Sequence, residues 1–206
     1  MSDGSTEHIK KFVFTSKYNA QGNPQEEELE VFIPEKRVNW KKSSGNWGWD
    51  ALPGIVAAKC GAKVIISESA LLPKSLAHTK RSCQLNNLNL SHQVQVTGLT
   101  WGLLLSNLDN LGPLDIIIGS DCFYDPTVFE DILVTLAYLF EIYPNAKFIC
   151  SYQERSSDWS IEHLLAKWKL RCQIHDTSTL GQSAGINVLE LIGPHSIHIL
   201  EITKLD

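Results

Sequence analysis

Short apolar runs alternate with helical patterns from residue 51 onward, and this alternation limits the possible folds more than any other feature. Runs typical of buried strands occur at 62–67, 93–99, 114–120 and 146–152. Strands that alternate with helices usually pair in parallel through right-handed crossovers, with helices on both faces of the sheet. Runs that are apolar almost throughout agree, because such strands are buried on both sides. We therefore predict an α/β fold with a doubly wound, mostly parallel sheet.

Helical periodicity fills the gaps between these strands. Asp125 and Pro126 open the clearest helix, with a carboxylate cap followed by proline at the first helical position. Ser157 or Asp158 is expected to cap the last helix. The predicted helices lie in "LPGIVAAKCG", at 71–86, after Asp125 and at 157–170.

Both ends of the chain suggest antiparallel pairing. Near the start, 9–14 and 28–33 alternate apolar and polar residues around a turn-rich segment, which predicts a hairpin. Near the end, two apolar segments at 187–193 and 196–203 flank a Gly–Pro turn. We expect them to add a closing hairpin to the parallel sheet.

The chain of 206 residues has the length of a single domain with an N-terminal addition. We predict an N-terminal extension with a strand hairpin over 1–34 and an atypical linker over 35–51. The main domain is expected at 52–206. A core of that size needs no disulfide or structural metal.

The composition excludes several classes of protein. Hydrophobic residues make up 43% of the chain and charged residues 20%, which fits neither a disordered chain nor a coiled coil. A net charge of −5 argues against a surface built throughout for phosphate backbones, so we expect no direct nucleic-acid partner. No secretory signal and no apolar run long enough to cross a membrane are found, so we expect no membrane partner.

The cysteines indicate a reducing compartment. Five of them are scattered among apolar runs without any C-x-x-C pair, at positions 60, 83, 122, 150 and 172. An odd, dispersed set is typical of reduced thiols in a cytosolic or nuclear protein. Because close ligand pairs are missing, we expect no metal site.

Acidic residues follow three of the predicted strands. Glu68 ends the first strand, Asp121 the third, and Glu154 comes just after the fourth. In open parallel sheets the ligand binds beyond the carboxyl ends of the strands, so we expect these side chains at one crevice. Glu68 then either accepts hydroxyls from the ribose of a nucleotide cofactor or only complements a helix dipole.

Two aromatic residues accompany these carboxylates. Tyr124 lies three residues after Asp121, and the pair suits a cationic or amine-bearing substrate. The alternative is that Asp121 only bonds the backbone amides of its own turn. Trp101 follows the second strand, where its ring can flank a flat base or close the core against a loop.

At these residues the chain resembles the seven-strand methyltransferases that use S-adenosyl-L-methionine, specifically the family 16 type. The resemblance rests on "LPGIVAAKCGAKVIISES", "CQLNNL", "VTGLTWG", "DIIIGSDCFYDPTVFEDIL" and "SYQERSSDWSIEHLLAKW", in this order. It implies a Rossmann-like domain and a cofactor, S-adenosyl-L-methionine. It further implies methylation of protein side chains, with histone arginine as the main expectation and lysine as the other family substrate.

The resemblance also implies roles for individual residues. Glu68 matches the residue that holds the cofactor ribose, and Trp101 matches the aromatic residue beside the adenine. Asp121 and Tyr124 match the D-x-x-[FY] signature at the methyl-transfer site, where Asp121 also borders the cofactor. The tail of the first cofactor loop is matched by Leu52, Pro53 and Gly54. The expected setting is chromatin and transcription regulation in the nucleus and cytoplasm, with a histone tail as partner and a possible chaperone association.

The segment 35–51 departs from the family pattern. The family has a buried strand and a Gly-x-Gly turn just before "LPGI", whereas "EKRVNWKKSSGNWGWDA" is basic and aromatic without an apolar run. Gly45 and Gly48 lack a preceding strand, so they do not form a cofactor fingerprint. The missing strand belongs at the centre of the family's sheet, and its loss leaves two neighbours with unpaired backbone groups. We therefore expect a shortened variant with weak or absent cofactor binding.

Three functions follow from these features. The first is a protein methyltransferase, in which Asp121 and Glu154 localise the charge of an arginine substrate. The second is a catalytically impaired variant that binds basic peptides at the acidic crevice. A nicotinamide-dependent oxidoreductase shares the fold class, but no G-x-G-x-x-G follows a strand.

Overall fold

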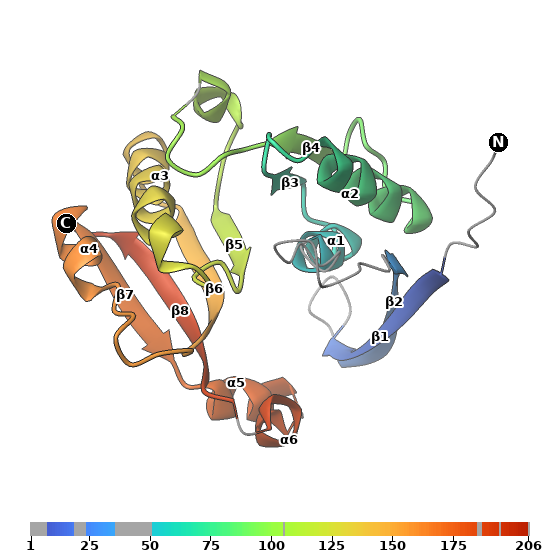
Figure 1. Cartoon of the computed structure of the whole chain (residues 1–206). Coiled ribbons are helices and arrows are strands. Elements are labelled where there is room, and N and C mark those ends of the chain that lie inside the picture. Colours follow the sequence, from blue (N-terminus) through green and yellow to red (C-terminus); the bar gives the residue numbers. More distant parts are fainter. Residues whose placement is uncertain are drawn as a thin grey trace. The chain divides into compact units, whose positions relative to one another are not determined.

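A computed structural model describes residues 8–18, 24–35, 51–104, 106–184, 187–193 and 195–205. The chain divides into two compact units, Met1–Thr100 and Trp101–Asp206 (Figure 1). Within the described ranges, no helix combines the length and the apolar character needed to cross a membrane. The predicted linker at 35–51 lies outside the described residues except for its two end positions, and the predicted domain boundaries remain predictions.

The first unit contains a hairpin and a small parallel sheet with two helices. Its elements are β1 (His8–Tyr18), β2 (Pro24–Glu35), α1 (Leu52–Lys59), β3 (Val64–Glu68), α2 (Pro73–Leu85) and β4 (Val94–Gly98). β1 and β2 pair antiparallel, as the sequence predicted for this region. β3 and β4 pair in parallel from Val64↔Val94 to Glu68↔Gly98, with α2 as the crossover between them.

The core of the first unit joins the hairpin to the helices. Buried residues come from β2, α1, α2 and both parallel strands: Val31, Ile33, Ala51, Ile55, Ala58, Ile66, Cys83 and Val94. Asn86, at the end of α2, adds a polar contact to β2. Its Nδ2 donates to the Phe32 carbonyl at 2.6 Å, and its Oδ1 accepts from the Phe32 amide at 2.9 Å. The side chain thus satisfies backbone groups of β2 on the side where the described residues provide no partner strand.

The second unit is built on a four-stranded sheet. Its elements are η1 (Ser106–Asn110), β5 (Ile116–Ser120), η2 (Pro126–Val128), α3 (Phe129–Ile142), β6 (Lys147–Gln153), α4 (Glu162–Lys167), β7 (Leu170–His175), α5 (Thr177–Ala184), α6 (Val188–Ile192) and β8 (Ile197–Lys204). The strand order is β5-β6-β8-β7 (Figure 1). β5 and β6 are parallel, whereas β8 runs antiparallel to both β6 and β7.

One face of this sheet carries the core of the second unit. α3 supplies Phe129, Ile132, Leu133, Leu136 and Phe140, which recur at the spacing of one helix face. These side chains pack with buried residues of the strands and α4: Phe148, Cys150, Leu164, Leu165, Leu170, Leu200 and Ile202. The prediction of an α/β fold with parallel strands and antiparallel pairing at its end is confirmed.

The antiparallel pair near the end of the chain is formed by other strands than predicted. Residues 187–193 were expected to form a strand, but residues 188–192 form the helix α6. β7, which the sequence analysis missed, pairs with β8 instead. The segment "VLELI" places apolar residues at both helical and strand spacings, so periodicity alone could not decide between them.

The predicted helix at 157–170 is much shorter in the structure. It covers Glu162–Lys167, and its N-cap residue Ile161 makes no side-chain capping bond, so the proposed caps Ser157 and Asp158 are wrong. Lys169 adopts a left-handed conformation with φ of 52°, which stops the helix. Leu170 then begins β7 and is buried in the core.

Two strands each have a single partner strand among the described residues. Among the described residues, β3 pairs only with β4 and β5 pairs only with β6. On β5, Ile116 and Ile118 are 53% and 51% exposed, which is high for strand isoleucines. The expectation that a lost central strand leaves two neighbours unpaired stays a prediction, because residues 36–50 lie outside the described part of the chain.

The buried cysteines provide a test of both cores. Cys83 in the first unit is fully buried, and burial raises the pKa of its thiol to about 11. Burial also raises the pKa of Cys150 in the second unit. Cys60 is exposed. Near neutral pH we expect iodoacetamide to modify Cys60 first and both buried thiols at least about tenfold more slowly, because only an accessible thiolate reacts.

Peptide mass spectrometry over a time course would measure these rates, with the denatured chain as control, in which all three thiols should react alike. Fast modification of Cys83 or Cys150 in the native chain would contradict the packing of the corresponding unit.

Candidate functional site

The loop after β5 holds two of the predicted site residues. In "SDCFYDP", Phe123 is fully buried, whereas Tyr124 is 59% exposed and Asp121 is partly exposed. The Phe123 ring packs edge-on against Phe129, with 5.3 Å between ring centroids, and against Tyr152. The apolar anchor between the two polar residues fixes the loop to the core and leaves Asp121 and Tyr124 accessible.

Asp121 has an unusual backbone conformation. Its φ is +53°, a left-handed value that aspartate tolerates better than most residues. Its backbone amide lies 3.1 Å from both the carbonyl oxygen and the Oγ of Ser151 on β6, and donates to them. Such strain persists only where neighbouring contacts enforce it, and it is frequent at functional sites.

The Asp121 carboxylate is paired with Arg155. Arg155 Nη1 donates to Oδ1 at 2.9 Å, and Nη2 donates to Oδ2, so the guanidinium engages both oxygens. These hydrogen bonds raise the pKa of the Arg155 guanidinium. The fork matches the geometry that makes arginine–carboxylate pairs specific. The structure therefore places a positively charged group of the chain itself on the predicted substrate carboxylate.

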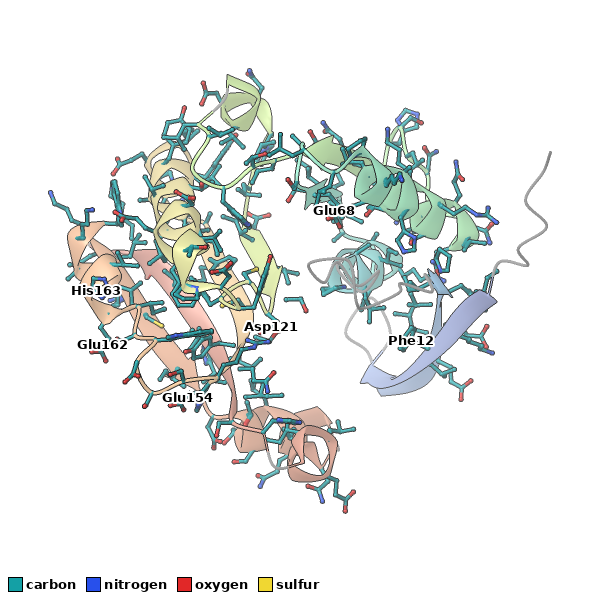
Figure 2. All side chains as sticks on the ribbon, in the orientation of Figure 1. Phe12, Glu68, Asp121, Glu154, Glu162 and His163 are labelled. Atoms are coloured by element: carbon teal, nitrogen blue, oxygen red, sulfur yellow. The ribbon has the colours of Figure 1, made fainter. Side chains whose placement is uncertain are left out.

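Glu154 lies beyond β6, next to Arg155, and its side chain is exposed (Figure 2). Its backbone amide donates to the Ser196 carbonyl at 3.0 Å, which holds the loop after β6 to the segment before β8. Burial raises the pKa of Tyr152, and the Glu154 charge adds to this effect. Since β5 and β6 are parallel, Asp121 and Glu154 follow strands that end at the same edge of the sheet.

Asp125 acts as the helix cap that the sequence predicted. Its side chain accepts hydrogen bonds from the amide of Thr127 at 3.0 Å and from the Thr127 hydroxyl at 2.7 Å. Both bonds lower the pKa of the Asp125 carboxyl. Asp125 therefore shapes the start of η2, the turn that leads into α3.

Trp101 and Gly102 form a tight turn against α3. The Gly102 amide donates to Thr135 Oγ1 at 2.9 Å, and the φ of Gly102 is +78°. A Cβ on Gly102 would lie 2.7 Å from Asp131 Oδ1, so a side chain has no room there. Trp101 is half-buried and packs against the core of the second unit. Trp101 thus packs against the core, which was one of the two roles predicted for it. The other, a contact with adenine, remains a prediction.

The remaining candidates lie in the first unit. Glu68 is the last residue of β3 and is 9% exposed, and its Oε1 accepts from Thr79 Oγ1 on α2 at 3.2 Å (Figure 2). Pro53 begins α1, where proline is well tolerated. A Cβ on Gly54 would lie 2.9 Å from Ile66 Cγ1, so glycine lets the first turn of α1 approach β3 closely.

The sequence located the carboxylates but missed the groups that hold them. Arg155, Ser151 and Thr79 were not singled out, although Arg155 stands inside "SYQERSS". A sequence signal for the pair did exist. The acidic Asp121 follows β5, and the basic Arg155 follows the parallel neighbour β6. No comparable signal pointed to Ser151 or Thr79. Among the described residues no group of three or more His, Cys, Asp or Glu side chains is arranged to hold a metal ion.

Comparisons with known proteins identify a family and several relatives. A family model described as lysine methyltransferase, family 16, matches residues 51–163. The chain is 48% identical over 154 residues to the histone-arginine methyltransferase METTL23 of Xenopus laevis, covering 74% of this chain and 64% of that protein. The human protein of the same name is 45% identical, with 74% of this chain and 80% of that protein covered. For the mouse protein the covered share is 60%, so the chain spans less than two thirds of the frog and mouse relatives.

Two solved structures are also similar. A methyltransferase from Pyrococcus furiosus gives a TM-score of 0.48 at 17% identity, covering 76% of this chain and 70% of that one. The human methyltransferase 10 domain containing protein gives a TM-score of 0.49 at 11% identity, covering 76% and 67%.

The contact between Glu68 and Thr79 can be tested by Thr79→Val, which keeps the shape and removes the hydroxyl. The buried Glu68 carboxylate then loses a donor, so we expect the free energy of unfolding to fall by about 1–2 kcal/mol. Urea denaturation followed by circular dichroism measures this change. Gln84→Val, at an exposed position of the same helix, is the control and should have a much smaller effect. Equal stability of Thr79→Val and the parent would contradict the contact.

Proposed function

Because the chain belongs to the family 16 methyltransferases, as its motifs predicted, we propose that it is an S-adenosyl-L-methionine-dependent protein methyltransferase that acts on arginine in a histone tail. The names of the Xenopus and human relatives support the substrate class. The observation that carries the proposal is the Asp121 carboxylate, which an enforced left-handed backbone holds at the end of β5 beside an exposed tyrosine.

The residues of the first unit fit the ribose of the cofactor. Glu68 ends β3, where a carboxylate accepts the two hydroxyls of a nucleotide ribose, and Thr79 fixes one of its oxygens. Pro53 and Gly54 open α1 against the same strand. Trp101, the first residue of the second unit, is assigned to the adenine by the same proposal. S-adenosyl-L-methionine, when bound, supplies a methyl group on a sulfonium.

The residues of the second unit act on the substrate. An arginine side chain has a pKa above about 12, so its guanidinium stays charged and must be oriented by carboxylates that localise the charge on one side. Asp121 and Glu154 are assigned this role, and Tyr124 lines the site with its exposed ring. Orientation of this kind can recover roughly 7–11 kcal/mol of an activation barrier.

The finer assignments are part of the same proposal. The chain acts in the nucleus and cytoplasm, on chromatin, and takes part in transcription regulation. Its proposed partners are a histone tail and a chaperone, with no direct contact to nucleic acid or membrane. The net charge of −5 supports a basic protein partner over a phosphate backbone.

A protein-binding module without catalytic activity is the second candidate. The observation that favours it is that β3 and β5 pair on one side only among the described residues, where the family has a central strand. Names of the relatives favour the enzyme. Cofactor binding separates the two functions.

Isothermal titration of the full chain with S-adenosyl-L-methionine tests the enzyme directly. As an enzyme, the chain should bind the cofactor with a dissociation constant of about micromolar order, which would overturn the sequence-based expectation of weak or absent binding. Glu68→Gln should then weaken binding about tenfold or more, because a charged acceptor of the ribose is lost. Glu162→Gln, an exposed carboxylate on α4, is the matched control and should leave binding unchanged. Absence of binding by the parent chain would favour the binding module.

Asp121→Asn tests the substrate carboxylate. Asparagine tolerates the left-handed backbone and keeps the shape, so the fold should remain intact while methyl transfer to a histone peptide falls at least about a hundredfold. Transfer is measured with radiolabelled cofactor, and folding by circular dichroism. Asp158→Asn, an exposed aspartate after β6, should keep full activity. Undiminished turnover by Asp121→Asn would refute the assignment.

A further inference from the structure

The two partners of the Asp121–Arg155 pair are anchored very differently. The backbone of Asp121 is held at two places. Its N–H donates hydrogen bonds to Ser151, and Phe123, two residues later, is buried in the core. The Arg155 guanidinium is held by Asp121, with one weak additional contact from Nη1 to the Gln153 carbonyl at 3.4 Å. The carboxylate is therefore fixed, whereas the guanidinium depends on the carboxylate for its position.

The surroundings of the pair allow the guanidinium to leave. Arg155 lies in the irregular segment after β6, and its side chain is 28% exposed, while that of Asp121 is 42% exposed. Ion pairs that are open to solvent contribute little net stability, because water replaces the lost bonds. The backbone anchors of Asp121 remain in place when the pair opens.

A substrate arginine presents the same chemical group as Arg155. Its guanidinium can donate the same two hydrogen bonds to the two oxygens of Asp121. Replacing Arg155 by a substrate arginine therefore leaves the number and geometry of these bonds unchanged. A lysine ammonium cannot reproduce the two parallel bonds of a planar fork. The geometry of the occupied carboxylate thus favours guanidinium over ammonium as the group that replaces Arg155.

On this basis, and resting on the proposed function, we propose that Arg155 is an internal competitor that occupies the Asp121 carboxylate until the arginine of a substrate displaces it. Arg155 lowers the apparent affinity for arginine peptides. It excludes lysine peptides, because an ammonium binds the Asp121 carboxylate too weakly to displace the two hydrogen bonds of Arg155. Arg155 is a specificity-determining residue and takes no part in the transfer itself.

The size of the effect follows from how often the pair is closed. If Arg155 occupies Asp121 about nine tenths of the time, the apparent affinity of a competing guanidinium is about tenfold weaker than the intrinsic one. Removing Arg155 should recover this factor for an arginine peptide. The same change should also let a lysine peptide bind measurably.

The experiment measures binding of a fluorescent basic peptide with one arginine, and of its lysine counterpart, to the full chain by anisotropy without cofactor. We expect Arg155→Ala to bind the arginine peptide about tenfold more tightly than the parent. Arg171→Ala, an exposed arginine on β7, removes the same charge elsewhere in the unit and measures the general electrostatic effect. In the Asp121→Asn background the effect of Arg155→Ala should vanish, because the two residues act through one contact.

Weaker or unchanged binding by Arg155→Ala, relative to Arg171→Ala, would overturn the proposal and show that Arg155 serves only to clamp the loop. Arginine Nε resonances of the parent chain give an independent measurement that needs no variant. Saturating arginine peptide should shift the Arg155 signal toward that of an exposed arginine, and an unshifted signal would also overturn the proposal. If no methyl transfer is found while Arg155 is still displaced, the proposed function fails and this inference stands.

Discussion

The geometry of the candidate substrate site depends on the packing of the buried Phe123 side chain in the core. Fully burying a side chain of this size stabilises the fold by about 1.5–3 kcal/mol, and the edge-on contact with Phe129 adds to it. Because the anchor lies between Asp121 and Tyr124, these two residues are presented to solvent on a loop that cannot easily rearrange. The left-handed strain at Asp121 is sustained by the same packing.

The second constraint concerns the edges of the sheets. Parallel strands are normally covered and paired on both sides, yet β3 and β5 each have one partner among the described residues. On β5, Ile116 and Ile118 are exposed, and the described residues provide no partner strand on its second side. Exposed edges of this kind are usually avoided, because they pair with other chains. The departure of 35–51 from the family pattern rests on the sequence alone, because residues 36–50 lie outside the described part of the chain.

Local patterns predicted most elements, since apolar runs and caps act over a few residues. β3, β4, β5, β6 and α3 were predicted within a few positions, and Asp125 was identified as a cap. The errors fell after residue 157, where the left-handed Lys169 and the ambiguous "VLELI" depend on tertiary packing. The strand-end rule likewise located Asp121, but its pairing with Arg155 depends on loop conformations that no local pattern encodes.

The two candidate carboxylates, Glu68 and Asp121, are supported by different cores. Glu68 depends on the first unit, where Thr79 contacts it from α2 and Gly98 on β4 pairs with it. Asp121 depends on the second unit, through Ser151 and Phe123. The residues proposed to hold the cofactor and those proposed to hold the substrate are thus stabilised by separate sets of contacts. A substitution in one core can therefore disturb one carboxylate while the local contacts of the other persist, which would make the proposed binding of cofactor and the proposed binding of peptide separable.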